Sequence, residues 1–160
     1  MTYNRMIADL ISASILPLWG YPIFLAVTSK NYGIMGIVIG AGLVSLGIEG
    51  FKKLVDAWAP NYGPFRRPAD AMNCSLLNSG GFVGGASGFP SGHTATAAFL
   101  ATALFYDSRP LARMLAFAYV IAVAVSRLAK SCHTLLHVVA GGIIGLAAGM
   151  AYRAWISAKN

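Results

Sequence analysis

The stretch Gly88-Phe89-Pro90-Ser91-Gly92-His93 leads directly into the apolar residues 94–106. Serine is a favoured helix N-cap, so this pattern predicts a helix that begins at Ser91. A helix N-terminus carries unpaired backbone N–H groups and about half a positive charge, and both suit a phosphate group. Gly92 would let the anion approach the backbone, and the imidazole of His93 is suited to proton transfer. Taken alone, these residues also fit an ordinary capped helix start.

The composition of the chain is typical of a membrane protein. Of its 160 residues, 57% are hydrophobic and only 11% are charged, whereas about 25% are charged in typical soluble domains. The charged residues gather between long apolar runs, as in chains that cross a bilayer several times. The net charge is +7. Because the basic residues form no long run, they indicate anionic headgroups or a phosphate substrate rather than nucleic acid.

The apolar runs predict an all-α, integral-membrane helical bundle that forms a single domain over residues 1–160. The expected transmembrane helices, about five, are residues 6–28, 32–51, 91–106, 111–129 and 134–156. One long polar loop, residues 52–92, separates the second from the third. Pro17 and Pro22 should kink or end the first helix in its second half. With five crossings, the N-terminus, the long loop and the connection 129–133 lie on the same side of the membrane.

Two sets of glycines predict close helix packing. Gly36 and Gly40 lie on one face of the second segment, and Gly141, Gly145 and Gly149 lie on one face of the last. Small residues at this spacing let helix backbones approach closely within a bilayer. Such faces fit contacts within one chain as well as contacts between two, so the oligomeric state stays open.

Further polar residues occur near the ends of the last two segments. Arg127 is followed, after five intervening residues, by His133, and His137 lies four positions later on the same helix face. A guanidinium holds phosphate through two parallel hydrogen bonds, and ionisable groups at membrane depth usually have a function. Arg67 adds a cation from the long loop. A second interpretation makes His93, His133 and His137 three ligands of a metal ion, although no neighbouring carboxylate is evident to complete the site.

These residues form three motifs: Arg67-Pro68, then Pro90-Ser91-Gly92-His93, then Ser126-Arg127 with the downstream His133. In order and spacing they resemble the signature motifs of the type 2 phosphatidic acid phosphatase superfamily. That superfamily includes membrane lipid phosphate phosphatases and, more distantly, vanadium haloperoxidases. The resemblance covers residues 53–137. It implies a metal-independent enzyme without a cofactor that removes phosphate from a lipid phosphate or an isoprenoid (di)phosphate.

The resemblance also implies a role for each residue of the site. The phosphate would be bound by Lys53, Arg67, Ser91, Gly92 and Arg127. His133 would be the nucleophile that forms a phosphohistidine, and His93 would be the acid that protonates the leaving group. Physical chemistry agrees with these roles, because cations and backbone donors stabilise the charge of a phosphoryl group in transfer. A covalent intermediate also divides one difficult step into two easier ones.

The sequence departs from the family pattern at two positions. The family lysine stands seven residues before the arginine of the first motif, where this chain has Pro60. Lys53 or Lys52 can replace it only if the loop carries an insertion. Four residues after the nucleophile the family has an aspartate that orients the imidazole, and this chain has His137. We include His137 in the catalytic group, but an imidazole brings no negative charge. This predicts a less active enzyme, or a carboxylate recruited from elsewhere, such as Asp70.

Two other functions remain open at this stage. One is a catalytically silent relative that binds lipid phosphate or scaffolds a membrane partner. The other is a small transporter or channel subunit, which fits the composition but leaves the His and Arg cluster unexplained. In the resembling family the active-site face is usually exoplasmic, meaning periplasmic, luminal or extracellular. In such a compartment Cys74 and Cys132 could form a disulfide.

Overall fold

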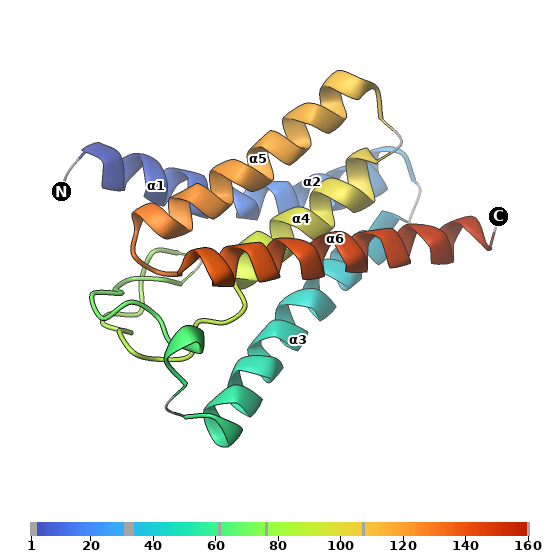
Figure 1. The fold of residues 1–160 in the computed structure, drawn as a ribbon. Coiled ribbons are helices and arrows are strands. Elements are labelled where there is room, and N and C mark those ends of the chain that lie inside the picture. Colours follow the sequence, from blue (N-terminus) through green and yellow to red (C-terminus); the bar gives the residue numbers. More distant parts are fainter. Residues whose placement is uncertain (1–2, 31–33, 61, 76, 107, 160) are drawn as a thin grey trace.

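The computed structural model is a bundle of helices with one long irregular segment at one end (Figure 1). It describes residues 3–30, 34–60, 62–75, 77–106 and 108–159. The helices are α1 (Tyr3–Ala13), α2 (Ile15–Thr28), α3 (Met35–Trp58), the short 3-10 helix η2 (Gly63–Phe65), α4 (Gly92–Phe105), α5 (Pro110–Ala129) and α6 (Leu135–Ser157). Within these ranges two isolated β-bridges occur but no strand. The predicted all-α class is therefore confirmed.

Four helical segments are long and apolar enough to cross a membrane: Arg5–Thr28, Met35–Trp58, Pro110–Ala129 and Leu135–Ser157. The third predicted segment corresponds to α4, which has only 14 residues. Its length of about 21 Å is shorter than a hydrocarbon core of roughly 30 Å. The described residues thus contain four membrane-length helical segments, and α4 is a shorter helix between the second and third of them. The predicted start of the second segment at Tyr32 lies outside the described residues.

The first membrane segment is broken at Ser14, between α1 and α2, and not in its second half as predicted. The Ser14 hydroxyl donates to the carbonyl oxygen of Ile11 at 2.6 Å and lies 2.9 Å from the Tyr119 hydroxyl of α5. This break places Pro17 in the first turn of α2, where a backbone N–H has no intrahelical acceptor to lose. Pro22 lies inside α2, which nevertheless continues to Thr28.

Helix α4 forms the centre of the bundle and packs against α2, α3, α5 and α6. Its residues from Thr94 to Ala103 are all buried. The glycines of α6 face this helix: a Cβ added to Gly149 would lie 2.6 Å from Cβ of Thr102, and one added to Gly145 would lie 2.8 Å from Cβ of Ala98. The glycine face of α6 therefore packs within the chain.

The glycines of α3 are also used inside the chain. A Cβ on Gly40 would lie 2.5 Å from Cζ of Phe99 in α4, and one on Gly36 would lie 2.8 Å from the Tyr152 hydroxyl of α6. These contacts let α3 pack against α4 and α6. Both predicted glycine faces thus hold the bundle together.

The long segment between α3 and α4 folds over one end of the bundle. Two β-bridges, Arg66 with Ser87 and Met72 with Phe82, draw its two halves together. A disulfide between Cys74 and Cys132 joins it to the connection between α5 and α6. This segment, that connection and the start of α4 lie at the same end (Figure 1), as the predicted order of crossings requires.

We expect Gly145→Ala to destabilise the protein by about 1–3 kcal/mol, because the added methyl group has no space against α4. Gly142→Ala is the matched control, since its Cβ would meet only Cγ2 of Thr94 at an ordinary 3.8 Å. Thermal unfolding in detergent should give a lower midpoint for the first variant only. Equal midpoints for the two variants would contradict the proposed α4–α6 contact.

Candidate active site

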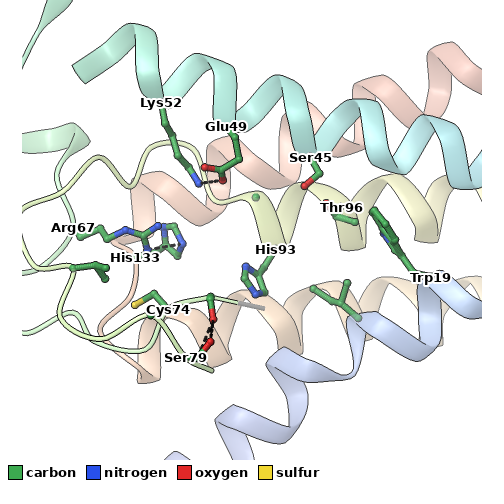
Figure 2. Close-up of a pocket in the computed structure, with 15 residues that line it drawn as sticks. Trp19, Ser45, Glu49, Lys52, Arg67, Cys74, Ser79, His93, Thr96 and His133 are labelled. Carbon is green, nitrogen blue, oxygen red and sulfur yellow. Dashed lines mark hydrogen bonds and ion pairs between the residues drawn. The ribbon is translucent and has the colours of Figure 1, made fainter. Parts of the chain in front are cut away.

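A pocket of about 430 Å³ lies at the end of the bundle where α4 begins. Its polar wall includes Glu49, Lys52, Arg67, Gly92, His93 and His133. Figure 2 shows that the labelled side chains among these converge from α3, the long segment, α4 and the turn before α6. Ile15 and Trp19 of α2 line the same pocket and give it an apolar side. Five separate parts of the chain therefore contribute to one site.

His133 is held beside Arg67. The Nη1 atom of Arg67 lies 3.3 Å from Nε2 of His133 and donates to the carbonyl oxygen of Cys132 at 2.9 Å. A guanidinium only donates hydrogen bonds, so Nε2 is the acceptor and the ring proton lies on Nδ1. The pKa of His133 is well below its usual value, because the ring is buried and the cations of Arg67 and Arg127 are near. Its imidazole is therefore neutral at neutral pH, as a nucleophile must be.

His137 does not orient His133 in this structure. Its Nε2 atom lies 2.9 Å from the carbonyl oxygen of Pro64, and its Nδ1 accepts a hydrogen bond of 3.4 Å from the backbone N–H of Thr134. The second bond is half of a capping box at the start of α6. The two histidine rings meet edge to face at 5.6 Å, without a hydrogen bond. His137 thus holds the long segment and caps a helix in this structure, and the catalytic role predicted for it stays a prediction.

The Nδ1 atom of His133 is buried and has no hydrogen-bond partner among the described residues. Asp70, the carboxylate suggested from the sequence as a replacement, is exposed and does not line the pocket. Only Glu49 brings a carboxylate to the pocket wall described above. No acidic group therefore takes the place of the family aspartate among the residues that the structure describes.

Lys52, and not Lys53, reaches the pocket. Helix α3 continues to Trp58 instead of ending at residue 51, so both lysines lie on a helix and point about 100° apart. Lys52 shares the buried face of α3 with Ile48 and Val55, whereas Lys53 is exposed. Apolar residues also occupy the exposed face, at Phe51 and Leu54, so the sequence carries no signal that selects Lys52.

Helix α4 starts as predicted. Ser91 caps the helix, whereas Gly92 and His93 line the pocket. Ser91 is the N-cap: its hydroxyl accepts hydrogen bonds from the backbone N–H of Thr94 at 3.5 Å and from the Thr94 hydroxyl at 3.1 Å. It is fully buried and does not line the pocket. Gly92 and His93 do line it, and Nε2 of His93 has no partner within the described ranges. The backbone of Gly92, rather than the Ser91 hydroxyl, is thus available to a ligand.

Arg127 lies behind the pocket wall and does not line it. Its Nη1 donates to the Ser12 hydroxyl of α1 at 2.9 Å, and its Nη2 donates to the carbonyl oxygen of Cys74 at 2.5 Å. Close by, Nζ of Lys130 forms an ion pair of 2.6 Å with Asp9. These contacts fasten α1 and the long segment to the end of α5. The phosphate-binding role predicted for Arg127 stays a prediction; in this structure its guanidinium bonds to the protein, and its charge lowers the pKa of His133.

The three histidines do not form the alternative metal site. In the part of the chain that the structure describes, no three His, Cys, Asp or Glu side chains are close enough together to hold a metal ion. Both ring nitrogens of His137 are occupied by the protein itself. The pocket therefore offers cations and backbone donors to an anion rather than ligands to a metal.

Comparison with known sequences gives a family for this chain. The sequence model of the PAP2 superfamily matches residues 32–160. The chain belongs to the PAP2 superfamily. The resemblance drawn from the three motifs is thereby confirmed. Searches of curated proteins and of solved structures found no match.

The PAP2 match contains every polar residue of the pocket wall but begins after α1 and α2. These two helices still contribute to the site, since Asp9 and Ser12 bind Lys130 and Arg127. Ile15 and Trp19 supply the apolar side of the pocket. The N-terminal helices thus complete a PAP2 site whose motifs lie elsewhere.

Replacement of Lys52 by alanine should reduce kcat/KM for a phosphate substrate by about 10–100-fold, because a charged hydrogen bond to the anion is worth about 1.5–3 kcal/mol. Lys53→Ala removes the same charge one residue later, from an exposed position, and should leave kcat/KM nearly unchanged. Steady-state kinetics of the two variants in detergent would decide between them. A larger loss of kcat/KM in Lys53→Ala than in Lys52→Ala would support Lys53 as the phosphate-binding lysine, as the sequence predicted.

Proposed function

We propose that the protein is an integral-membrane phosphatase that acts on a lipid phosphate or an isoprenoid (di)phosphate through a phosphohistidine. Membership of the PAP2 superfamily supports a phosphatase-type function at a membrane. The observation that carries the proposal is the pocket in which neutral His133 lies beside the cation of Arg67, with Lys52 facing them at the start of α4.

The phosphate binds at the polar wall of the pocket. Arg67 and Lys52 neutralise its charge, and the backbone N–H groups at the start of α4 donate to its oxygens. The hydrocarbon chain of the substrate leaves along Ile15 and Trp19 of α2. The pocket thus suits a molecule with an anionic head and an apolar tail.

Nε2 of His133 attacks phosphorus, and the bond between phosphorus and the leaving oxygen breaks. His93, which lines the same pocket, takes up a proton when the dianionic substrate binds, and it gives that proton to the leaving oxygen so that an alcohol is released. A water molecule then attacks the phosphohistidine and returns a proton to His93, and the phosphorus–nitrogen bond breaks to free phosphate. Arg67 stabilises the phosphoryl group in both steps, because the guanidinium that lies beside His133 can also donate hydrogen bonds to the phosphoryl oxygens.

A second candidate is a silent relative that binds lipid phosphate without cleaving it. It is favoured by Nδ1 of His133, which has no hydrogen-bond partner in the described part of the chain. Without a carboxylate on that atom, the positive charge that develops on the ring during attack is not stabilised as it is in a triad. The two candidates share the binding site and differ only in turnover.

Purified protein should release phosphate from at least one member of a panel of lipid and isoprenoid phosphates, with EDTA present. His133→Ala should abolish release, because no other residue of the pocket replaces the nucleophile. Rapid quenching should trap an acid-labile phosphoryl group on wild-type protein and none on the variant. Absence of release from every substrate would favour the silent relative. Loss of release in EDTA alone would revive a metal-dependent mechanism.

We propose further that the pocket end of the bundle is exoplasmic. The disulfide at this end fits an oxidising compartment. Several basic residues there, including Lys52, Arg127 and Lys130, are buried in the protein and do not face headgroups. The opposite end carries Lys30, Arg109, Arg113, Arg153 and Lys159. An excess of Lys and Arg in loops marks the cytoplasmic side.

Protein extracted from cells in the presence of an alkylating reagent should contain Cys74 and Cys132 as one linked peptide pair in non-reducing mass mapping. Both thiols should become alkylated only after reduction. Recovery of two alkylated cysteines without reduction would contradict the exoplasmic placement.

A further inference from the structure

Glu49 is the acidic residue of the pocket wall described above, and it takes no part in the proposed phosphatase mechanism. Its Oε1 lies 2.5 Å from Nζ of Lys52, one of the two cations proposed to hold the phosphate. A carboxylate in a site built for a multiply charged anion opposes the binding of that anion. Its presence next to Lys52 therefore requires an explanation of its own.

The ion pair lies directly over the start of α4. A Cβ placed on Gly92 would be 3.8 Å from Oε1 of Glu49 and 4.0 Å from Nζ of Lys52. Gly92 and His93 are the first two residues of α4, so their backbone N–H groups have no intrahelical acceptor. A helix N-terminus favours any anion, and a carboxylate meets this preference as a phosphate does. Glu49 thus places its charge where the phosphate is expected.

The two side chains of the ion pair differ in their exposure to solvent. The side chain of Lys52 is 10% exposed, whereas that of Glu49 is 59% exposed. Figure 2 shows both projecting from α3 into the pocket, across from Arg67 and His133. The carboxylate therefore has room to leave toward solvent, while the ammonium group stays at the site.

We propose that Glu49 is an internal competitor for the phosphate site. In the resting protein its carboxylate neutralises Lys52 and covers the start of α4, and an incoming phosphate takes its place. After the reaction, the return of Glu49 to Lys52 helps to expel inorganic phosphate. The inference rests on the proposed phosphate site, and it names a residue that sets the affinity of that site.

Such a competitor has a use inside a bilayer. Phospholipid headgroups are phosphodiesters with one negative charge each at the phosphate, and they surround the protein at high concentration. A carboxylate that must be displaced lowers the occupancy of every anion by a common factor. The weakly held diester is then kept out, while a doubly charged phosphate monoester still binds Lys52 and Arg67 together. The competitor thereby lowers the fraction of pockets that bulk headgroups occupy, while the ratio of monoester to diester affinity is set by Lys52 and Arg67.

A positioning role and a competing role of Glu49 predict opposite changes in phosphate affinity when its charge is removed. If Glu49 served to position Lys52, its neutralisation would weaken the binding of phosphate. If it competes, Glu49→Gln will tighten the binding of inorganic phosphate at least tenfold, which corresponds to about 1.4 kcal/mol. It will also lower KM without raising kcat, because product leaves more slowly.

The experiment measures the dissociation constant of inorganic phosphate by calorimetry in detergent for wild type, Glu49→Gln and Asp56→Asn. Asp56→Asn is the matched control: it makes the same charge change on the same helix, in an ion pair of 2.5 Å with Arg66, away from the pocket. Its phosphate affinity should equal that of wild type. Inhibition of turnover by phosphatidylglycerol, a phosphodiester, should appear or increase in Glu49→Gln only.

Unchanged or weaker phosphate binding in Glu49→Gln would overturn the inference, as would equal tightening in Asp56→Asn, which would indicate net charge alone. Failure of all three proteins to bind phosphate would overturn both the inference and the proposed function. If wild type binds phosphate but releases none from any substrate, the proposed phosphatase activity fails. The competitor role of Glu49 is then decided by the binding constants.

Discussion

The close approach of α4 to α6 is the contact on which the site depends. It exists because Gly145 and Gly149 present no side chain to the central helix. At this separation the backbone N–H of Ser91 donates to the carbonyl oxygen of His137 at 2.9 Å, which ties the start of α4 to the first turn of α6. His133, which lies just before α6, is thereby placed beside the α4 N-terminus. A bulkier contact between the helices would separate the imidazole from the backbone donors.

The long segment completes the site because several independent contacts fasten it. His137 holds it at Pro64, the disulfide holds it at Cys74, and Arg127 bonds to the carbonyl oxygen of that same cysteine. Arg67 lies between these anchor points and donates to the carbonyl oxygen of Cys132. Ordering a segment of this length costs conformational entropy, and these cross-connections offset that cost. The guanidinium can then stay beside a neutral histidine without a ligand.

The electrostatic character of the pocket follows from the burial of more cations than carboxylates. Arg67 has a lowered pKa because it is buried, and the pKa of His133 is lowered by burial and by the arginines. A site of this kind attracts a multiply charged anion and keeps its imidazole unprotonated. In the resting state Glu49 supplies the one carboxylate described in this pocket, so the charge balance changes when a ligand enters.

The sequence by itself determined the helical class, because long apolar runs have only helices available to them in a bilayer. It also predicted the helix start at Ser91, which is the N-cap of α4. The resemblance of the three motifs to the PAP2 superfamily implied that Arg67 and His133 belong to one site. Only the tertiary structure decided that Lys52 and not Lys53 lines the pocket, since a shift of one residue on a helix changes the direction of a side chain by about 100°. Only the tertiary structure likewise shows that the His137 ring contacts the carbonyl oxygen of Pro64. Which hydrogen bonds a ring makes depends on the neighbours that folding brings to it, and those neighbours lie far away along the chain.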